Sequence, residues 1–221
     1  LDKLAEMYQP DKKTPAVIEF VDIAGLVKGA SKGEGLGNKF LANIRETDAI
    51  VHVVRCFDDE NVIHVGGSTD PIRDMDTIDL ELVMADLEMV ERRIDKAKKA
   101  AKGDKKFLQE AADFEGLRDW LNDGKSARTY EAVDIAQEYP DCELLSLKPV
   151  IYAANLDEDG FADPHGVEYY RQVEERAQAQ GAQVIPVCAK LEAEIAELDG
   201  EEKKMFLDDL GIAESGLDRL I

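Results

Sequence analysis

The chain has 221 residues, of which 44% are hydrophobic, and its formal net charge is −21. A chain of this size and composition buries a substantial core, so we expect a folded protein. The large negative charge repels phosphate and argues against broad, non-specific binding of nucleic acid. Its apolar runs are far shorter than the ~20 residues of a membrane span, and its three cysteines form no CxxC pair. These features predict a protein of the reducing cytoplasm without membrane contact.

The first elements predicted along the chain are a short helix within residues 1–13, a strand and a glycine-rich loop. The apolar run Val17–Val21 predicts the strand, which ends in Asp22. Five glycines follow: Gly25, Gly29, Gly33, Gly35 and Gly37. Glycine loses much conformational entropy on folding, so a purely structural loop has little reason to contain so many. A helix over Leu36–Arg45 and a buried strand over Ala49–Cys56 come next.

From Ile78 the apolar pattern becomes helical. Seven apolar residues recur at spacings of three and four, and they predict a long helix with a heptad seam: Leu80, Val83, Leu87, Val90, Ile94, Ala97 and Ala101. A second helix, over residues 105–121, is predicted to pack back on the first, and a third is predicted over 127–138. Structural packing explains this seam better than a cofactor does.

Sheet character returns after these helices. Strands are predicted at Pro149–Ala154 and Gln183–Val187, with a helix at Gly166–Gln180 between them. Strands that alternate with helices indicate an α/β fold with a parallel, doubly wound sheet. The helical residues would then be an inserted lobe. The predicted division is a first part of the sheet domain, the inserted lobe, and a second part of the sheet domain, over residues 1–77, 78–147 and 148–221.

Three short motifs follow predicted strands, at the edge where open α/β sheets bind ligands. They are Asp22-Ile23-Ala24-Gly25, Asn155-Leu156-Asp157-Glu158 and Cys188-Ala189-Lys190. P-loop GTPases place a phosphate sensor, a base reader and a base-supporting loop in this order. A carboxylate at a strand end can hold a hydrated cation, and a glycine amide can approach a phosphate closely. We therefore predict that Asp22 and Gly25 sense Mg²⁺ and the γ-phosphate, within a switch region over residues 22–37.

The second motif bears on the choice of base. In the usual Asn-Lys-x-Asp motif, the Asp accepts two hydrogen bonds from guanine and the Lys stem covers the ring. Here Leu156 replaces the Lys and the longer Glu158 replaces the Asp, so guanine loses its bidentate partner. We therefore predict a preference for ATP, with Leu156 against the ring, Asn155 bracing the loop and the third motif supporting the base. A GTPase, which differs only in base choice, stays an alternative.

Four stretches of this sequence together resemble one family, the Obg-like ATPases of YchF type. They read FVDIAGLVKGASKGEGLGNKFLANIRETDAIVHVVRCF, NLDEDGF, PVCAKLEAEIAEL and EEKKMFLDDLGIAESGLDRLI. The likeness extends over essentially the whole chain. It implies a cytosolic P-loop ATPase of the translation-factor class that associates with ribosomes. It also implies a G domain, an inserted coiled-coil lobe, a C-terminal TGS domain, and a preference for ATP through the Asn-x-x-Glu motif.

The residue after the first motif bears on hydrolysis. Ras-like enzymes have a glutamine there, which orients the attacking water. This chain has Leu26, which neither donates nor accepts a hydrogen bond, and the resemblance implies a hydrophobic residue there too. Another group must then position the water. Our candidate is His64, in the loop after the Ala49–Cys56 strand, and the alternative is that His64 is an ordinary surface-loop residue.

The sequence contains no G-x-x-x-x-G-K-[ST] phosphate loop. Its Gly-Lys-Ser triplet, residues 124–126, lacks the leading glycine and follows a helix, so it is not such a loop. We therefore expect a fragment of a longer protein, which starts after the phosphate loop, stops before the TGS domain and hydrolyses nucleotide negligibly on its own. The alternative from a different class is a non-catalytic interaction module that acts through the helical lobe.

A basic segment stands out in this acidic chain. Arg92–Lys106 carries eight basic and two acidic residues, a local charge of +6. A solvated helix face explains it as well as a docking patch for RNA or a ribonucleoprotein does. Combined with the resemblance, it leads us to expect that nucleotide state is coupled to docking on a ribosome or a similar partner.

Overall fold

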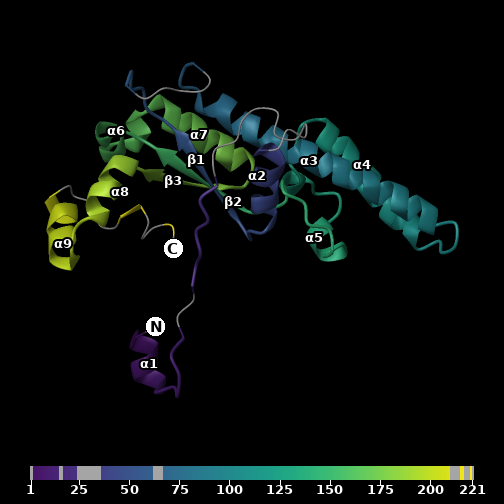
Figure 1. The fold of residues 1–221 in the computed structure, drawn as a ribbon, viewed down its shortest axis with the longest axis horizontal. Helices are drawn as coiled ribbons and strands as arrows, with labels where there is room; N and C mark the ends of the chain where they lie inside the picture. Colours follow the sequence, from purple (N-terminus) through teal and green to yellow (C-terminus); the bar gives the residue numbers. More distant parts are fainter. Residues whose placement is uncertain are drawn as a thin grey trace.

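The sheet has three parallel strands in the order β1-β2-β3 (Figure 1). The computed structural model describes residues 2–14, 17–23, 36–61, 67–209, 215–216 and 220. Its strands are β1 (Ile50–Arg55), β2 (Val150–Asn155) and β3 (Gln183–Val187). Val54 lies opposite Ala154, which in turn lies opposite Pro186. The predicted α/β class with a parallel sheet is confirmed.

Helices pack against this sheet and extend beyond it. They are α1 (Asp2–Tyr8), α2 (Leu36–Arg45), α3 (Pro71–Ala100), α4 (Phe107–Asn122), α5 (Ile135–Glu138), α6 (Glu158–Ala162), α7 (Glu168–Ala179), α8 (Ala189–Ala196) and α9 (Gly200–Asp209). The helix predicted over residues 36–45 is α2, and those predicted over 105–121 and 166–180 are α4 and α7. None of the described helices combines the length and the apolar character that crossing a membrane requires.

One face of the sheet is packed and part of the other is open. The helix α7 and the first turns of α3 cover the packed face, where a single cluster contains Val54, Cys56, Met75, Val150, Tyr152, Ala154, Leu156, Tyr170, Val173 and Ala177. Side chains alternate across a strand, so neighbours of Val54 point the other way. On that side of β1, Val51 is 36% exposed and Val53 is 62% exposed. Along β1, the described sheet is therefore covered on one face and open to solvent on the other.

The helix α3 begins at Pro71, whereas the sequence predicted a start at Ile78. Asp70 caps it, because its side chain accepts a hydrogen bond from the Arg73 N–H at 3.0 Å. Pro71 stands at the first helical turn, where its missing N–H is harmless. The first turns are mostly polar, so an analysis of apolar spacing misses them. Leu80, predicted in the seam, is 49% exposed.

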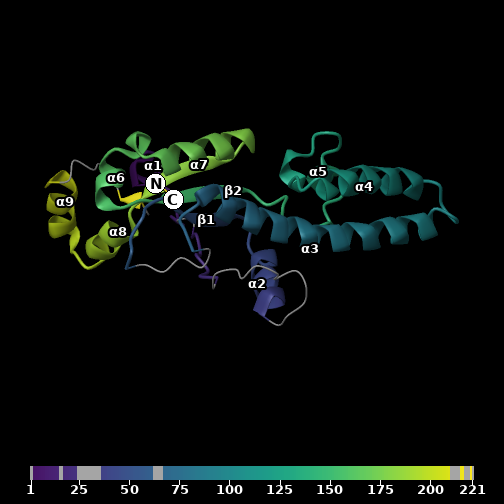
Figure 2. The same ribbon diagram turned by 90° about the horizontal axis from the view of Figure 1, so that it is seen from above.

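The helices α3 and α4 form an antiparallel hairpin that projects away from the sheet (Figure 2). Its core contains Val83, Val90, Ile94, Phe114, Leu117 and Leu121, together with residues from the segment after α4. Trp120, the one tryptophan of the chain, lies in α4. Its Nε1 donates to the Ser126 carbonyl at 3.1 Å, and Lys125 Nζ lies 4.2 Å from the centre of its ring. The hairpin thus has its own core.

The single helix predicted over residues 127–138 is wrong. A short 3-10 helix over Ala127–Thr129 and the one-turn helix α5 stand in its place. The backbone N–H groups of Ala127 and Arg128 donate to the Ser146 side chain and carbonyl, at 3.0 and 3.2 Å. These bonds hold the chain against a distant segment, so the helix does not continue.

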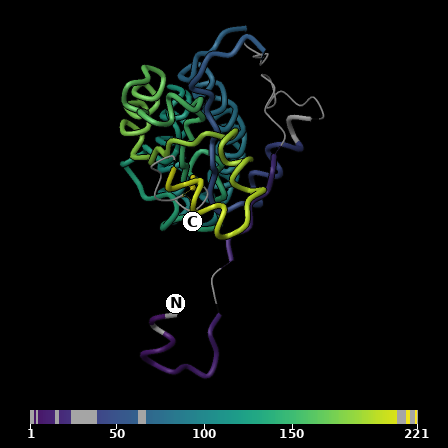
Figure 3. Tube along the Cα trace, turned by 90° about the vertical axis from the view of Figure 1, so that its left-hand side faces the viewer, coloured from purple at the N-terminus to yellow at the C-terminus, as the bar shows by residue number. Residues whose placement is uncertain are grey.

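The strand predicted over Val17–Val21 is also wrong. These residues pair with none of the described strands, and their large apolar side chains are 50–88% exposed. An apolar run becomes a strand only when a neighbouring strand takes up its backbone hydrogen bonds. Figures 1 and 3 show α1 and this segment leading away from the sheet.

A buried ion pair lies at the base of the hairpin and joins α3 to the segment after α4. Asp79 of α3 is 7% exposed and accepts hydrogen bonds from Arg128, at 3.1 Å, and from Gln180 after α7, at 2.8 Å. The predicted boundary between residues 77 and 78 lies inside α3, close to this pair. The division of the chain into parts stays a prediction. The hydrogen bond from Gln180 connects this pair to the end of α7, which packs on the sheet.

Candidate functional site

The second and third motifs lie side by side at the carboxyl ends of β2 and β3. The strands are paired up to Asn155, which lies opposite Val187. Beyond that pair the Leu156 N–H donates to the Val187 carbonyl at 2.8 Å. The Asn155 side-chain oxygen accepts from the Ala189 N–H at 3.0 Å. Asn155 therefore braces the loop, and it does so by holding the backbone of the other motif.

The residues after Asn155 form a tight start to α6. The Leu156 side chain is 2% exposed and belongs to the sheet core. Asp157 caps α6 by accepting from the Gly160 N–H at 2.8 Å. A Cβ at Gly160 would lie 2.8 Å from Asp157 Oδ1 and 3.0 Å from Val167, so a glycine is needed there. The predicted contact of Leu156 with a base stays a prediction, and in this conformation its side chain offers no open apolar surface.

An ion pair crosses the two motifs above this braced backbone. Glu158 Oε1 lies 2.6 Å from Lys190 Nζ, and the two side chains are 50% and 71% exposed. The hydrogen bond to Glu158 and the charge of its carboxylate raise the pKa of Lys190. Both charged groups face solvent at the sheet edge, where a ligand can reach them. Sequence reasoning named both residues but missed their pairing, although their opposite charges on adjacent strand ends were a signal.

The rest of the third motif supports the loop. The Cys188 side chain is 1% exposed, and its carbonyl accepts from the Glu192 N–H at 2.9 Å in the first turn of α8. The Glu192 side chain accepts in turn from the Gly216 N–H at 2.5 Å. Cys188 is therefore part of the packed base of the loop, and Ala189 presents its N–H to Asn155.

The first motif is described only in part. Asp22 is exposed, and it makes no hydrogen bond or ion pair with another residue in the part of the chain that the structure describes. Ile23 packs against the cluster that α2 forms with α3. Gly25, Leu26 and His64 lie outside the described residues. The roles predicted for Asp22, Gly25, Leu26 and His64 therefore stay predictions.

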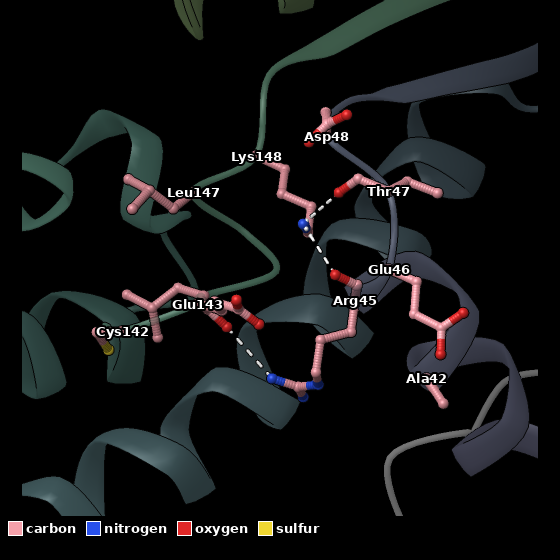
Figure 4. A pocket seen from close by; sticks show the side chains of 10 residues that line it. Ala42, Arg45, Glu46, Thr47, Asp48, Cys142, Glu143, Leu147 and Lys148 are labelled. Carbon is pink, nitrogen blue, oxygen red and sulfur yellow. Dashed lines mark hydrogen bonds between the residues drawn. The ribbon is translucent and has the colours of Figure 1, made fainter. Parts of the chain in front are cut away.

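A groove of about 760 Å³ lies at the opposite edge of the sheet (Figure 4). Its lining residues Thr47 and Lys148 precede β1 and β2, so it lies at the amino ends of these strands. Six-residue strands are about 20 Å long, which separates the groove from the motifs by roughly that distance. Figure 4 shows Lys148 pointing to the backbone of the α2 end, where its ammonium donates to the Thr47 carbonyl and, at 3.3 Å, to that of Arg45. The Arg45 side chain donates to the Glu143 carbonyl at 3.2 Å.

The segment on the far side of this groove is held by a buried carboxylate. Asp86 of α3 is fully buried and accepts from the backbone N–H groups of Leu145, at 2.8 Å, and Ser146, at 2.7 Å. Burial raises the pKa of Asp86, and these hydrogen bonds act against that rise. Residues 142–148 are thus bonded to α3 on one side and to α2 on the other. The sequence signal that we missed was an acidic residue within the buried face of a long helix.

Replacing Asn155 by Ala should free the Ala189 N–H without disturbing the strand ladder. A typical hydrogen bond contributes about 0.5–1.5 kcal/mol, so amide exchange at Ala189 should accelerate by roughly 2- to 10-fold. Hydrogen exchange followed by NMR measures this directly. Asn155→Asp keeps an acceptor and is the matched control. Unchanged exchange at Ala189 in Asn155→Ala would show that the side chain does not hold the loop.

Comparison with known proteins shows which family the chain resembles. Residues 3–103 match the family described as 50S ribosome-binding GTPase. The ribosome-binding ATPase YchF of Bacillus subtilis is 52% identical, and that of Haemophilus influenzae is 51% identical, each over 100% of this chain and 61% of the relative. The chain therefore spans about three fifths of the length of these curated relatives.

A solved structure agrees with this match. The Schizosaccharomyces pombe YchF GTPase superimposes with a TM-score of 0.81 at 34% identity, over 99% of this chain and 60% of that protein. The curated YchF of Escherichia coli O157:H7 is 48% identical over the whole chain. The resemblance seen in the four sequence stretches is confirmed. This chain is homologous over its whole length to the YchF family.

Proposed function

We propose that this chain is the nucleotide-binding and ribosome-docking part of an NTPase that prefers ATP to GTP. The observation that carries the proposal is the braced pair of motifs at the ends of β2 and β3, with Glu158 and Lys190 exposed above them. The matched relatives are named ribosome-binding ATPases, and the matching family is named for GTPases. With a ribosomal partner, we propose that the protein acts in the cytoplasm.

The first contribution to the preference for adenine comes from Glu158. A carboxylate accepts hydrogen bonds and, when ionised, donates none. The 6-amine of adenine donates, whereas the 6-oxo group of guanine accepts and would face the carboxylate unfavourably. A site whose polar groups are left without a partner discriminates strongly against the wrong ligand. Asn155 contributes to recognition of the base indirectly, because it holds the Ala189 backbone.

The phosphate end of the site is assigned to the first motif. The described residues contain no cluster of three or more His, Cys, Asp or Glu side chains suited to a metal. Mg²⁺ in nucleotide complexes takes most of its ligands from phosphate and water, so one exposed carboxylate such as Asp22 fits it. Bound Mg²⁺ would neutralise phosphate charge. Gly25 would sense the γ-phosphate, Leu26 would leave the water-orienting position apolar, and His64 is our candidate for positioning the water.

Coupling to the partner is proposed to pass through α2. This helix begins at the end of the switch region, and its Leu41 and Ile44 are buried against Leu82 of α3 and Leu145. Its carboxyl end is bonded to Lys148, at the end of the segment that Asp86 holds. A shift of α2 with nucleotide state would therefore move residues 142–148, and with them the base of the hairpin.

Docking is assigned to the tip of the hairpin. Of its basic residues, Lys98 is paired with Glu115 and Lys106 with Asp104. Four exposed lysines make no ion pair within 4.0 Å in the described part of the chain: Lys96, Lys99, Lys102 and Lys105. Cations that are free of acidic partners can replace the counterions of RNA phosphates. The tip is therefore the surface that we propose contacts ribosomal RNA.

Titration of the full-length protein with fluorescent ATP and GTP analogues tests the choice of base. We expect ATP to bind at least about tenfold more tightly, because one well-placed hydrogen bond to a charged group contributes ~1.5–3 kcal/mol. Preference for GTP would overturn the adenine assignment. Binding of neither nucleotide would contradict the NTPase proposal and favour an interaction module.

Reversing two tip charges, Lys99→Glu with Lys102→Glu, should weaken co-sedimentation with ribosomes. Each lost phosphate contact should lower the slope of log K against log salt by about 1, so the loss should be largest at low salt. The control, Lys12→Glu with Lys204→Glu, makes the same charge change at two exposed lysines elsewhere. Equal loss of ribosome co-sedimentation in the two double variants would contradict the proposal that the tip contacts ribosomal RNA.

Replacing Lys148 by Met should uncouple the hairpin from the nucleotide. The variant keeps the apolar stem but loses the hydrogen bonds to the end of α2. We expect ribosome affinity of the full-length protein to differ between ATP and ADP, and this difference to shrink in Lys148→Met while the nucleotide Kd stays the same. A full nucleotide effect in the variant would mean that the coupling runs elsewhere.

A further inference from the structure

We propose that Lys190 determines base specificity together with Glu158, by donating a hydrogen bond to N1 of adenine while Glu158 accepts from the 6-amine. The inference rests on the proposed nucleotide site and gives one of its residues a new role. From the sequence, Lys190 was predicted only to belong to the loop that supports the base. The structure places its ammonium next to the carboxylate that reads the base.

The geometry gives the two side chains a common position at the sheet edge. Glu158 and Lys190 follow adjacent parallel strands, and their charged atoms lie 2.6 Å apart. The backbone beneath them is held by the bonds from Leu156 to Val187 and from Ala189 to Asn155. The ends of both side chains remain largely exposed. The pair thus has a fixed base and free hydrogen-bonding capacity above it.

That free capacity has a definite pattern. The ammonium has three donors and uses one on Glu158, whose second oxygen has no hydrogen-bond partner among the described residues. The pair therefore presents an acceptor beside a donor. Adenine presents the complement along one edge, a donating 6-amine beside the accepting N1. Guanine presents the reverse, an accepting 6-oxo group beside a donating N1–H.

Glu158 alone does not explain rejection of guanine. A single carboxylate can accept equally well from the N1–H and 2-amine of guanine, if the base shifts along its edge. The Lys190 ammonium removes that option, because it occupies the neighbouring position, where its donors would face the 2-amine of the shifted guanine, which is also a donor. Lys190 therefore supplies the part of the discrimination that Glu158 lacks.

The test measures the Kd of the full-length protein and of its Lys190→Met variant for ATP, GTP and 1-deaza-ATP, which keeps the 6-amine but has no N1 acceptor. The unaltered protein should bind 1-deaza-ATP about tenfold more weakly than ATP, as expected for the loss of one hydrogen bond to a charged group. In Lys190→Met the two should bind alike, and the discrimination against GTP should fall. Lys190→Arg keeps a donor and should retain part of both effects. Lys204→Met, at another exposed lysine, is the matched control.

Two failures of this test are distinguishable. If ATP binds but the ratio of the 1-deaza-ATP and ATP affinities is the same in Lys190→Met as in the unaltered protein, Lys190 does not contact N1 and the inference is overturned, while the proposed function stands. If the unaltered protein binds none of the three nucleotides, the proposed function fails and takes the inference with it.

Discussion

Two hydrogen bonds that extend the β2–β3 ladder past its last pair determine the candidate site. They run from the Leu156 N–H to the Val187 carbonyl and from the Ala189 N–H to the Asn155 side chain. Sites are more precise when their side chains stand on rigid elements. Because the second bond uses a side chain, the loop after β3 depends on the identity of Asn155, the last residue of β2. Without it, the charged groups above the two strands would lose their common frame.

The sequence predicts those elements of the fold whose cause is local. The strand β1 is a short β-branched run and α2 has a clear helical pattern, and the structure has both. Val17–Val21 has equal strand character, but pairing with a neighbour decides, and no described strand lies beside it. The capping residue Asp70 precedes polar turns that carry no apolar signal. The helix predicted after α4 gives way to hydrogen bonds with Ser146, which local sequence does not reveal.

The same distinction holds for the site. The meeting of two motifs was predictable, since parallel strands end at one edge of their sheet. Their ion pair was not, because the reach and direction of two long side chains are not encoded in motif spacing. The joint of Lys148 with the end of α2 also links segments that lie about a hundred residues apart, and nothing in either segment marks it. For Leu156 the motif suggested a side chain exposed to the base, whereas in the structure this side chain is buried in the core.

Trp120 has a practical consequence, since it is the one tryptophan of the chain and lies in α4 of the hairpin. Its indole is bonded to the Ser126 carbonyl and lies under the Lys125 ammonium, far along the chain from either strand-end motif. Within this chain, intrinsic tryptophan fluorescence therefore reports on the hairpin and not on the site proposed to bind the nucleotide base. A spectral change on adding nucleotide would be an optical signal that the base of the hairpin has responded, obtained without any label.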